Sequence, residues 1–247
     1  MSDVLQNYRQ IWKAKPLLRI IYGDIFDRIV RRCVSGITLE VGGGIGNLKS
    51  RLPDLWSSDI QYAPWLDLVA DAQCLPFENG VLANIVMLDV LHHIEFPILF
   101  FREAARKLRP GGRIIMVEPA ITCGSTLFYR LIHHEPVDMS ADCLLDGTVR
   151  PDRNPYDSNQ AVPTLIATKY RDRFHQLIPD LQIVETNWFS LAAYPLSGGF
   201  KRWSLIPARL APALLRWEKI IEKFAGPVFG FRILLVVEKR GSGILQS

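Results

Sequence analysis

The chain has 247 residues, 49% of them hydrophobic, and a formal net charge of +4. This is enough apolar material for one large domain with a buried core, and no Pro/Gly/Ser-rich linker divides it. No apolar run reaches the roughly 18 residues of a membrane span, and the N-terminal stretch lacks a signal-peptide core. The four cysteines form no CxxC pair. We therefore expect a cytoplasmic protein with neither a disulfide scaffold nor a metal site.

The positive charge gathers in the last part of the chain. From Lys201 onward there are nine Lys/Arg and three Glu, a net charge of +6. This charge is too small to indicate a nucleic-acid-binding protein, so we expect no nucleic-acid partner. It is compatible with an acidic substrate or with peripheral contact at the inner face of the membrane. A solvated basic face is an equally good interpretation.

The first predicted elements are a helix, a strand and a glycine turn. Apolar residues recur at helical spacing over residues 16–34, and Gly36 ends that segment. The short β-rich run ITLEV is followed at once by GGGIG, and residues 47–52 are expected to begin a helix. A strand, glycine turn and helix in this order are typical of the nucleotide-binding end of an α/β domain.

The alternation of strands and helices then continues along the chain. LDLVA, NIVML and RIIMVE are predicted strands, and the unbroken apolar run of NIVML indicates the buried centre of a parallel sheet. A helix is expected over residues 97–108, closed by RPGG. Residues 148–163 read as a long loop, of the kind that is usually functional or disordered. LQIVETNWFSL and FRILLVVEK are the last two predicted strands.

The string LEVGGGIGN carries the strongest functional signal. Glycine permits positive φ and lets a ligand approach the backbone closely. A dinucleotide fingerprint reads GxGxxG, but here Gly42, Gly44 and Gly46 are spaced as GxGxG, and Asn47 stands where the third glycine would be. The spacing argues against a nucleotide-cofactor oxidoreductase, as does the absence of a Tyr-x-x-x-Lys pair after the fourth strand.

Four motifs in order resemble the class I S-adenosylmethionine (SAM)-dependent methyltransferases. They are E-x-G-x-G-x-G at residues 40–46, the acidic Asp59, DAQCLPF at 71–77, and MLDVLHHI at 87–94 before LRPGGRIIMVEP. The chain is most similar to the small-molecule group related to ubiquinone/menaquinone-biosynthesis enzymes, the type 11-like methyltransferases. The resemblance implies a Rossmann-like α/β fold, a doubly wound, mostly parallel seven-stranded sheet with helical and loop insertions.

The resemblance also implies one domain over residues 1–247. Residues 1–35 would form a helical cap, 36–120 the SAM-binding core, and 121–247 the acceptor-side loops, helices and last two strands. The usual helix between the second and third strands is missing or reduced here, because the chain from Asp59 to Asp71 is short.

SAM is the cofactor that the resemblance implies. Glu40 would approach its amino group, Asp59 its ribose hydroxyls and Asp71 its adenine amino group, while Asp89 and Leu91 would lie under the methionine chain. Asp59 and Asp71 could instead cap turns. The residues to which the resemblance gives cofactor contacts are Glu40, Gly42, Gly43, Gly44, Gly46, Asp59, Asp71, Ala72, Asp89 and Leu91.

Two histidines are candidates for catalysis. Methyl transfer needs a base only when the acceptor is a weak acid, and a histidine has a suitable pKa. His92 follows the central strand at the edge where ligands bind, although it could merely shape the turn. His134, beside Glu135, is the second candidate. His175 lies in a basic helical run and is expected to be remote.

Further acceptor contacts are expected from the loops and from the C-terminal third. Asn159 and Gln160 lie in the long loop. Residues 194–203, which end at Trp203, are expected to border an apolar acceptor cavity.

The predicted helix over residues 212–224 carries an apolar stripe beside basic residues and fits either a membrane interface or packing on the sheet. Packing is favoured, because Glu218 and Glu222 dilute the positive face.

The sequence thus predicts a methyltransferase that acts on a small or lipophilic acceptor. A non-catalytic SAM-binding or protein-interaction member of the same fold is the alternative. The acceptor, the attacked atom and the oligomeric state stay open.

Overall fold

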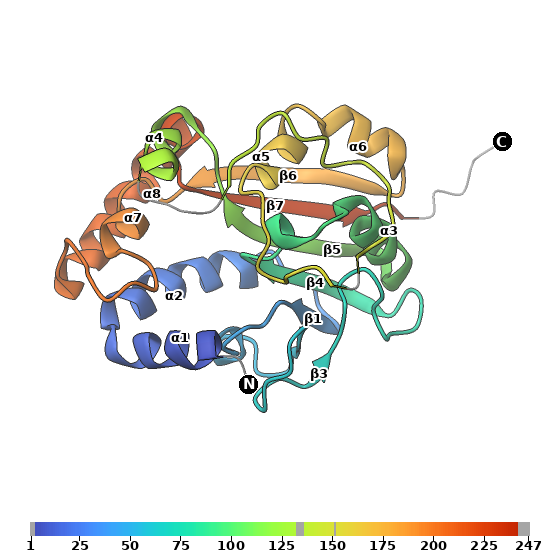
Figure 1. Ribbon diagram of the computed structural model, residues 1–247, viewed down its shortest axis with the longest axis horizontal. Coiled ribbons are helices and arrows are strands. Elements are labelled where there is room, and N and C mark those ends of the chain that lie inside the picture. Colours follow the sequence, from blue (N-terminus) through green and yellow to red (C-terminus); the bar gives the residue numbers. More distant parts are fainter. Residues whose placement is uncertain (1–2, 132–135, 151, 242–247) are drawn as a thin grey trace.

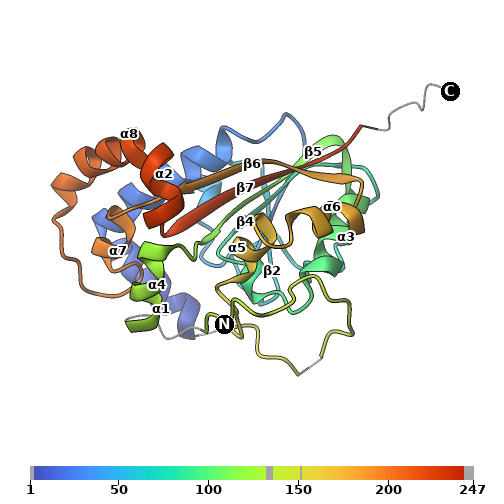
Figure 2. The same ribbon diagram turned by 90° about the horizontal axis from the view of Figure 1, so that it is seen from above.

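The computed structural model describes residues 3–131, 136–150 and 152–241. In this part of the chain a seven-stranded sheet lies between helical layers (Figures 1 and 2). The strand order is β3-β2-β1-β4-β5-β7-β6; all neighbouring strands are parallel except that β7 is antiparallel to β5 and β6. The strands are β1 (Thr38–Val41), β2 (Trp56–Asp59), β3 (Leu68–Val69), β4 (Leu82–Leu88), β5 (Leu108–Pro119), β6 (Leu181–Phe189) and β7 (Arg232–Lys239). The predicted fold class is confirmed.

Eight α-helices and three 3₁₀ turns complete the described elements. The α-helices are α1 (Asp3–Ala14), α2 (Pro16–Val30), α3 (Pro97–Lys107), α4 (Cys123–Leu131), α5 (Val162–Ala167), α6 (Arg171–Leu177), α7 (Ala193–Ser197) and α8 (Ala211–Phe229). The 3₁₀ turns are η1 (Leu48–Ser50), η2 (Leu91–His93) and η3 (Ala208–Leu210). None of these described helices is long and apolar enough to cross a membrane.

Two apolar clusters hold the layers together. Strand β4 is buried along almost its whole length, as the sequence LANIVML requires of a central strand. On one face of the sheet, side chains of α3, α5 and α6 join the core, including Phe101 and Phe174 in edge-to-face contact. On the other face, α2 supplies Leu18, Ile21 and Ile25. Helices therefore cover both faces of the sheet (Figure 2).

The predicted helix over residues 47–52 is wrong, because the chain makes only the short turn η1 there. Pro53 stops the segment early, and α2, which precedes the sheet in sequence, covers that face instead. The segment between β2 and β3 is irregular, as the short spacing predicted. The first predicted helix ends at Val30 rather than at residue 34, and it is preceded by the separate helix α1.

Helix α8 is oriented opposite to the sequence-based expectation. Its charged side is buried in part: Glu218 and Glu222 are enclosed, and Glu222 accepts two hydrogen bonds from the Arg28 guanidinium of α2 at 2.9 and 3.0 Å. Trp217 and Phe224, which were expected to pack inward, are exposed. Two contacts fix this orientation: the buried Arg28–Glu222 pair, and Gly226, where α8 lies so close to the Trp188 backbone of β6 that a Cβ would clash.

Candidate functional site

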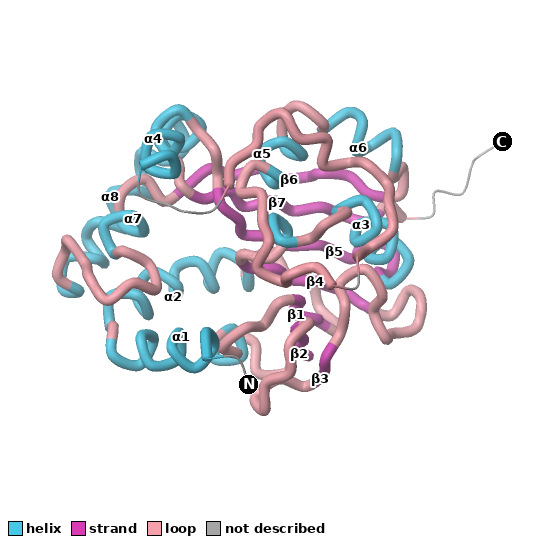
Figure 3. The backbone as a smooth tube through the Cα atoms, viewed as in Figure 1, coloured by secondary structure: helices cyan, strands magenta, loops and turns pink. Residues whose placement is uncertain are grey.

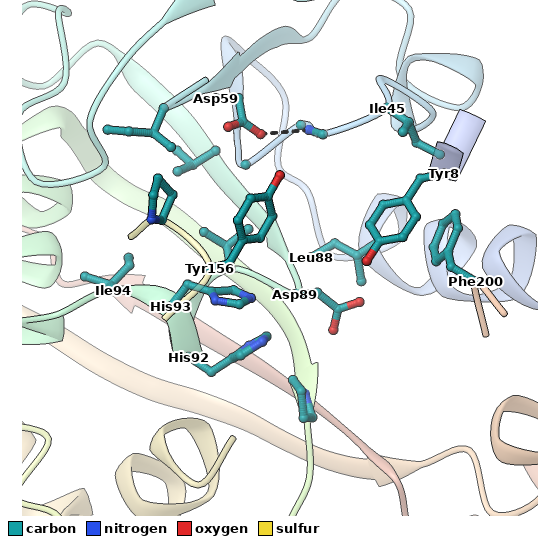
Figure 4. A pocket seen from close by; sticks show the side chains of 18 of the residues that line it. Tyr8, Ile45, Asp59, Leu88, Asp89, His92, His93, Ile94, Tyr156 and Phe200 are labelled. Carbon is teal, nitrogen blue, oxygen red and sulfur yellow. Dashed lines mark hydrogen bonds between the residues drawn. The ribbon is translucent and has the colours of Figure 1, made fainter. Parts of the chain in front are cut away.

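A cavity of about 870 Å³ opens at the carboxyl ends of the parallel strands. The strand order reverses between β1 and β4, the position where α/β sheets bind ligands. Figure 4 shows the carboxylates of Asp59 and Asp89 and the rings of His92 and His93 around this cavity. The volume lies near the top of the usual range of about 300–1,000 Å³ for ligand pockets. The cavity can therefore hold more than one small molecule.

The glycine loop forms one wall of the cavity. Gly42 has φ +73°, and a Cβ there would come within 2.2 Å of the Val90 side chain. Gly44 has φ +49°, and a Cβ there would meet only the Gly42 carbonyl oxygen, at 3.9 Å. Gly42 is therefore required for packing, whereas the missing side chain of Gly44 leaves space for a ligand.

Glu40 is buried behind this loop. Its carboxylate accepts a short hydrogen bond from the Ser57 hydroxyl, and it also lines the cavity. Burial raises the pKa of Glu40 to about 7, and the nearby Asp59 acts in the same direction, while the Ser57 hydrogen bond opposes it. A cationic group in the cavity would favour the ionised form. Glu40 is thus suited to an ammonium ligand.

Asp59 ends β2 and braces the glycine loop. Its Oδ2 accepts from the Gly44 amide and its Oδ1 from the Gln61 amide, both at 3.0 Å. Each carboxylate oxygen has a second lone pair, so both can also accept from a ligand hydroxyl. Asp59 therefore performs the turn-bracing role considered for it and also faces the cavity.

Asp71 and Ala72 also line the cavity. The Asp71 Oδ1 accepts from the Gln73 amide at 2.8 Å, which is the turn-capping bond of the alternative interpretation. Asp71 therefore both caps the turn and faces the cavity. The adenine contact of Asp71 stays a prediction.

Asp89 has an ionic partner that sequence reasoning missed. It occupies the left-handed region at φ 60°, where Asp is among the tolerated non-glycine residues. Its carboxylate accepts two hydrogen bonds from the Arg232 guanidinium, which is 2% exposed and stacks 4.1 Å from the centre of the Tyr194 ring. Because β7 is antiparallel, its first residue, Arg232, reaches the edge where β4 ends. The antiparallel orientation of β7 was the information that the sequence pattern lacked.

His92 is held by a carboxylate from β5. Its Nδ1 lies 2.6 Å from Oε2 of Glu118, whose other oxygen accepts from the amides of Val90 and Leu91 at 2.9 and 2.8 Å. Glu118 is fully buried. An ionised Glu118 can only accept hydrogen bonds, so this contact favours the tautomer in which Nδ1 carries the proton and donates it to Glu118. His92 lines the cavity, and a catalytic role for it stays a prediction.

The long loop covers a further side of the cavity. Residues 148–150 and 152–161 are irregular, as predicted, up to the start of α5 (Figure 3). The Arg153 guanidinium donates to the His93 carbonyl at 2.5 Å, and the backbone N–H of Asn159 donates to the His92 carbonyl at 2.9 Å. The loop is therefore bonded to the backbone of both histidines. Tyr156 and Gln160 face the cavity.

The expectation for Asn159 is wrong, because its side chain bonds to the backbone of Asp138 and Ala161 and does not line the cavity. It fixes the loop.

The opposite wall comes from residues 194–203 and the N-terminal helices, as predicted for residues 194–203. Tyr194, Phe200 and Trp203 line the cavity, and Tyr8 of α1 lies with its ring centre 4.8 Å from that of Phe200. This wall is fixed by Lys15. Its ammonium group donates to four backbone carbonyls, those of Ser197, Gly199, Lys201 and Trp203, at 2.5–2.9 Å.

Some predicted residues lie elsewhere. Leu91 is fully buried, Gly46 lies against Trp65, and neither lines the cavity. His175 accepts from the Ile183 amide at 3.1 Å, where α6 meets β6, and stays outside the cavity, as expected. His134 and Glu135 lie outside the described residues.

Comparisons with known proteins agree with this architecture. Residues 39–116 match the sequence profile of a methyltransferase domain. A sequence comparison with curated proteins found no match.

Among solved structures, a SAM-dependent methyltransferase from Thermotoga maritima, a possible histamine N-methyltransferase, is 12% identical with a TM-score of 0.54, covering 91% of both chains. A SAM-dependent methyltransferase from Archaeoglobus fulgidus is 13% identical with a TM-score of 0.50, covering 92% of this chain and 95% of its own. The [4+2]-cyclase SpnF is 18% identical with a TM-score of 0.52, covering 88% and 80%.

The fold is therefore the Rossmann-like fold of SAM-dependent methyltransferases. The matched segment holds β1, the glycine loop, Asp59, Asp71, Asp89 and His92, and the comparisons support SAM as its cofactor.

Proposed function

We propose that this protein transfers a methyl group from SAM to a small, lipophilic acceptor. The proposal rests on one observation: residues suited to binding SAM and a histidine suited to act as a base line the same cavity. Glu40, Gly44 and Asp59 supply a cradle on one wall, and an oriented histidine, His92, lies at the same sheet edge. We further propose that residues 1–247 work as one domain. A relation to ubiquinone/menaquinone enzymes stays a prediction.

The cradle fits the chemistry of SAM. The open space at Gly44 admits the methionine chain, and the buried Glu40 carboxylate meets its ammonium group. Each carboxylate oxygen of Asp59 accepts one hydrogen bond from a loop amide and uses its second lone pair to accept from a ribose hydroxyl. Asp71 and the Ala72 amide hold the adenine. When bound, SAM supplies an electrophilic methyl carbon on a sulfonium.

The residues of this chain then align the acceptor and take its proton. An acceptor oxygen, nitrogen or carbon forms the new bond to the methyl carbon while the carbon–sulfur bond breaks, and its electron pair stays on sulfur. His92 Nε2 takes the proton that the acceptor loses, and Glu118 stabilises the resulting imidazolium. Asp89 and Arg232 fix the backbone between the two halves of the cavity. Positioning of this kind contributes much of the rate in a displacement reaction.

The acceptor wall supports a lipophilic substrate. Tyr8, Phe128, Phe200, Trp203 and Phe231 line it, and apolar and aromatic surfaces of this kind bind apolar molecules. We also propose that the protein works at the periphery of a membrane, where such acceptors accumulate.

Incubation of a cell lipid extract with the protein and methyl-labelled SAM tests the proposal. The expected result is a labelled, extractable product that wild type forms and that His92→Ala forms at least about 100-fold more slowly. Calorimetric binding of SAM without any label transfer from aqueous and lipid extracts would instead support the non-catalytic alternative. SpnF shows that this fold also hosts a cyclase, so the label transfer, and not the fold, decides the reaction.

A further inference from the structure

The outward face of α8 is apolar. Trp217, Ile220 and Phe224 are 53%, 73% and 85% exposed, and their spacing puts them on one side of the helix. Among the described residues 21 large hydrophobic side chains are exposed, and eight of them lie between residues 203 and 229. Figure 2 shows α8 at the outer end of the molecule. A concentration of this kind marks an interaction surface.

The charge of the same surface is entirely positive. The segment of residues 196–230 carries six exposed basic side chains: Lys201, Arg202, Arg209, Arg216, Lys219 and Lys223. Its two acidic residues point inward: Glu218 accepts from the amides of Ala192 and Ala193 at 2.5 and 2.6 Å, and Glu222 pairs with Arg28. Lys219 pairs with the buried Asp24 of α2, and the other five basic side chains leave the exposed surface of this segment positively charged, with no exposed acidic side chain of its own.

The surface continues to the mouth of the cavity. Trp203 and Lys201 are exposed and also line the cavity, and the chain leads from them through η3 into α8. The exposed α8 face and the aromatic wall of the cavity are therefore joined by one short segment of chain. Lys15 holds this connecting segment to the N-terminal helices.

We propose that the α8 face, defined by Trp217, Ile220 and Phe224 with the flanking Arg216 and Lys223, binds the surface of an anionic lipid bilayer. Apolar side chains enter the interface and basic side chains contact lipid phosphates. A second copy of the chain is a poorer occupant, because two-fold pairing would bring the basic side chains of both copies together. The lipid-collecting role of the surface rests on the proposed function, but binding itself does not.

Vesicle flotation tests the inference with the full chain. The probes are phosphatidylcholine vesicles with and without phosphatidylglycerol at about one part in three. Wild type is expected to float with the anionic vesicles and to be released by salt. The variant Trp217→Ala/Phe224→Ala should float at least about fivefold less, since both side chains are exposed and their loss leaves the core intact. Leu145→Ala/Leu177→Ala, which removes two exposed residues elsewhere, is the matched control.

Equal flotation of the α8 variant and the control would overturn the inference. Failure of wild type to float would also overturn it. So would light scattering that shows a dimer of wild type without lipid and a monomer of the α8 variant. SAM calorimetry on the same variants separates this result from the proposed function. If wild type floats but does not bind SAM, only the proposed methyltransferase function is refuted. If wild type binds SAM but does not float, only membrane binding by the α8 face is refuted.

Discussion

The two halves of the cavity are built in different ways. The wall formed by residues 36–119 is set by neighbours in the sheet: Gly43 bonds to Ser58, and Gly44 to Asp59, within one pair of strands. The opposite wall is assembled over long separations in the sequence. Lys15 reaches carbonyls more than 180 residues away, and Arg232 reaches Asp89 across 143 residues. The first wall is thus fixed by short motifs, whereas the second depends on the whole fold.

This difference suggests a division of labour. A wall built from short motifs retains the same cofactor geometry whatever surrounds it. A wall built from distant segments can change its shape without disturbing the first one. We therefore expect substitutions on the two walls to affect different measurements.

The largest effect is expected where the two walls meet, at His92. Replacement with alanine removes the base that Glu118 orients, and turnover should fall about 10²- to 10⁴-fold with SAM affinity unchanged. Single-turnover kinetics on the true acceptor measures this. Wild-type turnover in the variant would show that His92 only shapes the turn.

A smaller effect is expected at Asp71 on the cofactor wall. Loss of a hydrogen bond to a charged acceptor costs about 1.5–3 kcal/mol, so Asp71→Ala should weaken SAM binding about 10- to 100-fold. Asp138→Ala is the control, since it removes a similar turn bond, to Ser140, outside the cavity. A collapsed melting temperature combined with normal SAM binding by the remaining folded protein would assign Asp71 to turn capping instead.

The pKa of Glu40 predicts the pH dependence of the cofactor wall. Burial raises this pKa to about 7 from its ordinary 4.5, so the carboxyl is mostly protonated at pH 5.5. Binding of a cationic amino group requires the ionised form. SAM affinity should therefore rise roughly fifteenfold from pH 5.5 to 7.0, as measured by calorimetry.

The contribution of Glu40 to folding stability changes with pH in the opposite direction to its contribution to SAM binding. The folded state holds the proton more tightly than the unfolded state, so this group makes the free energy of unfolding fall as pH rises from about 4.5 to 7. Glu40→Gln should bind SAM more weakly with a flat profile. A sloping profile in that variant would place the titration elsewhere.

The smallest effect is expected at Lys15, on the acceptor wall. Lys15→Met removes the cation that holds four carbonyls, and about 1 kcal/mol of ordering would be lost, which corresponds to about a fivefold higher acceptor KM. Lys13→Met is the control, because its side chain is not part of this bond network. Loss of SAM affinity in Lys15→Met, with KM unchanged, would break the division between the walls.

The sequence predicted the cofactor wall better than the acceptor wall, for a physical reason. Glu40, Gly44 and Asp59 could be identified because strand periodicity and a local motif put them at one sheet edge. The Arg232–Asp89 pair could not, since it depends on the antiparallel placement of β7. The orientation of α8 was also predicted wrongly, because the buried Arg28–Glu222 pair that sets it joins residues 194 positions apart.

Calorimetric titration of SAM into two variants, Gly44→Val and Trp203→Ala, tests the central claim most directly. Gly44→Val puts a side chain into the cradle and should weaken binding about 10- to 100-fold. Gly80→Val, which also replaces a glycine of positive φ with open space around it, should bind like wild type. Trp203→Ala should retain wild-type affinity and lose acceptor turnover. Unchanged binding by Gly44→Val, or an equal loss in Trp203→Ala, would contradict the account.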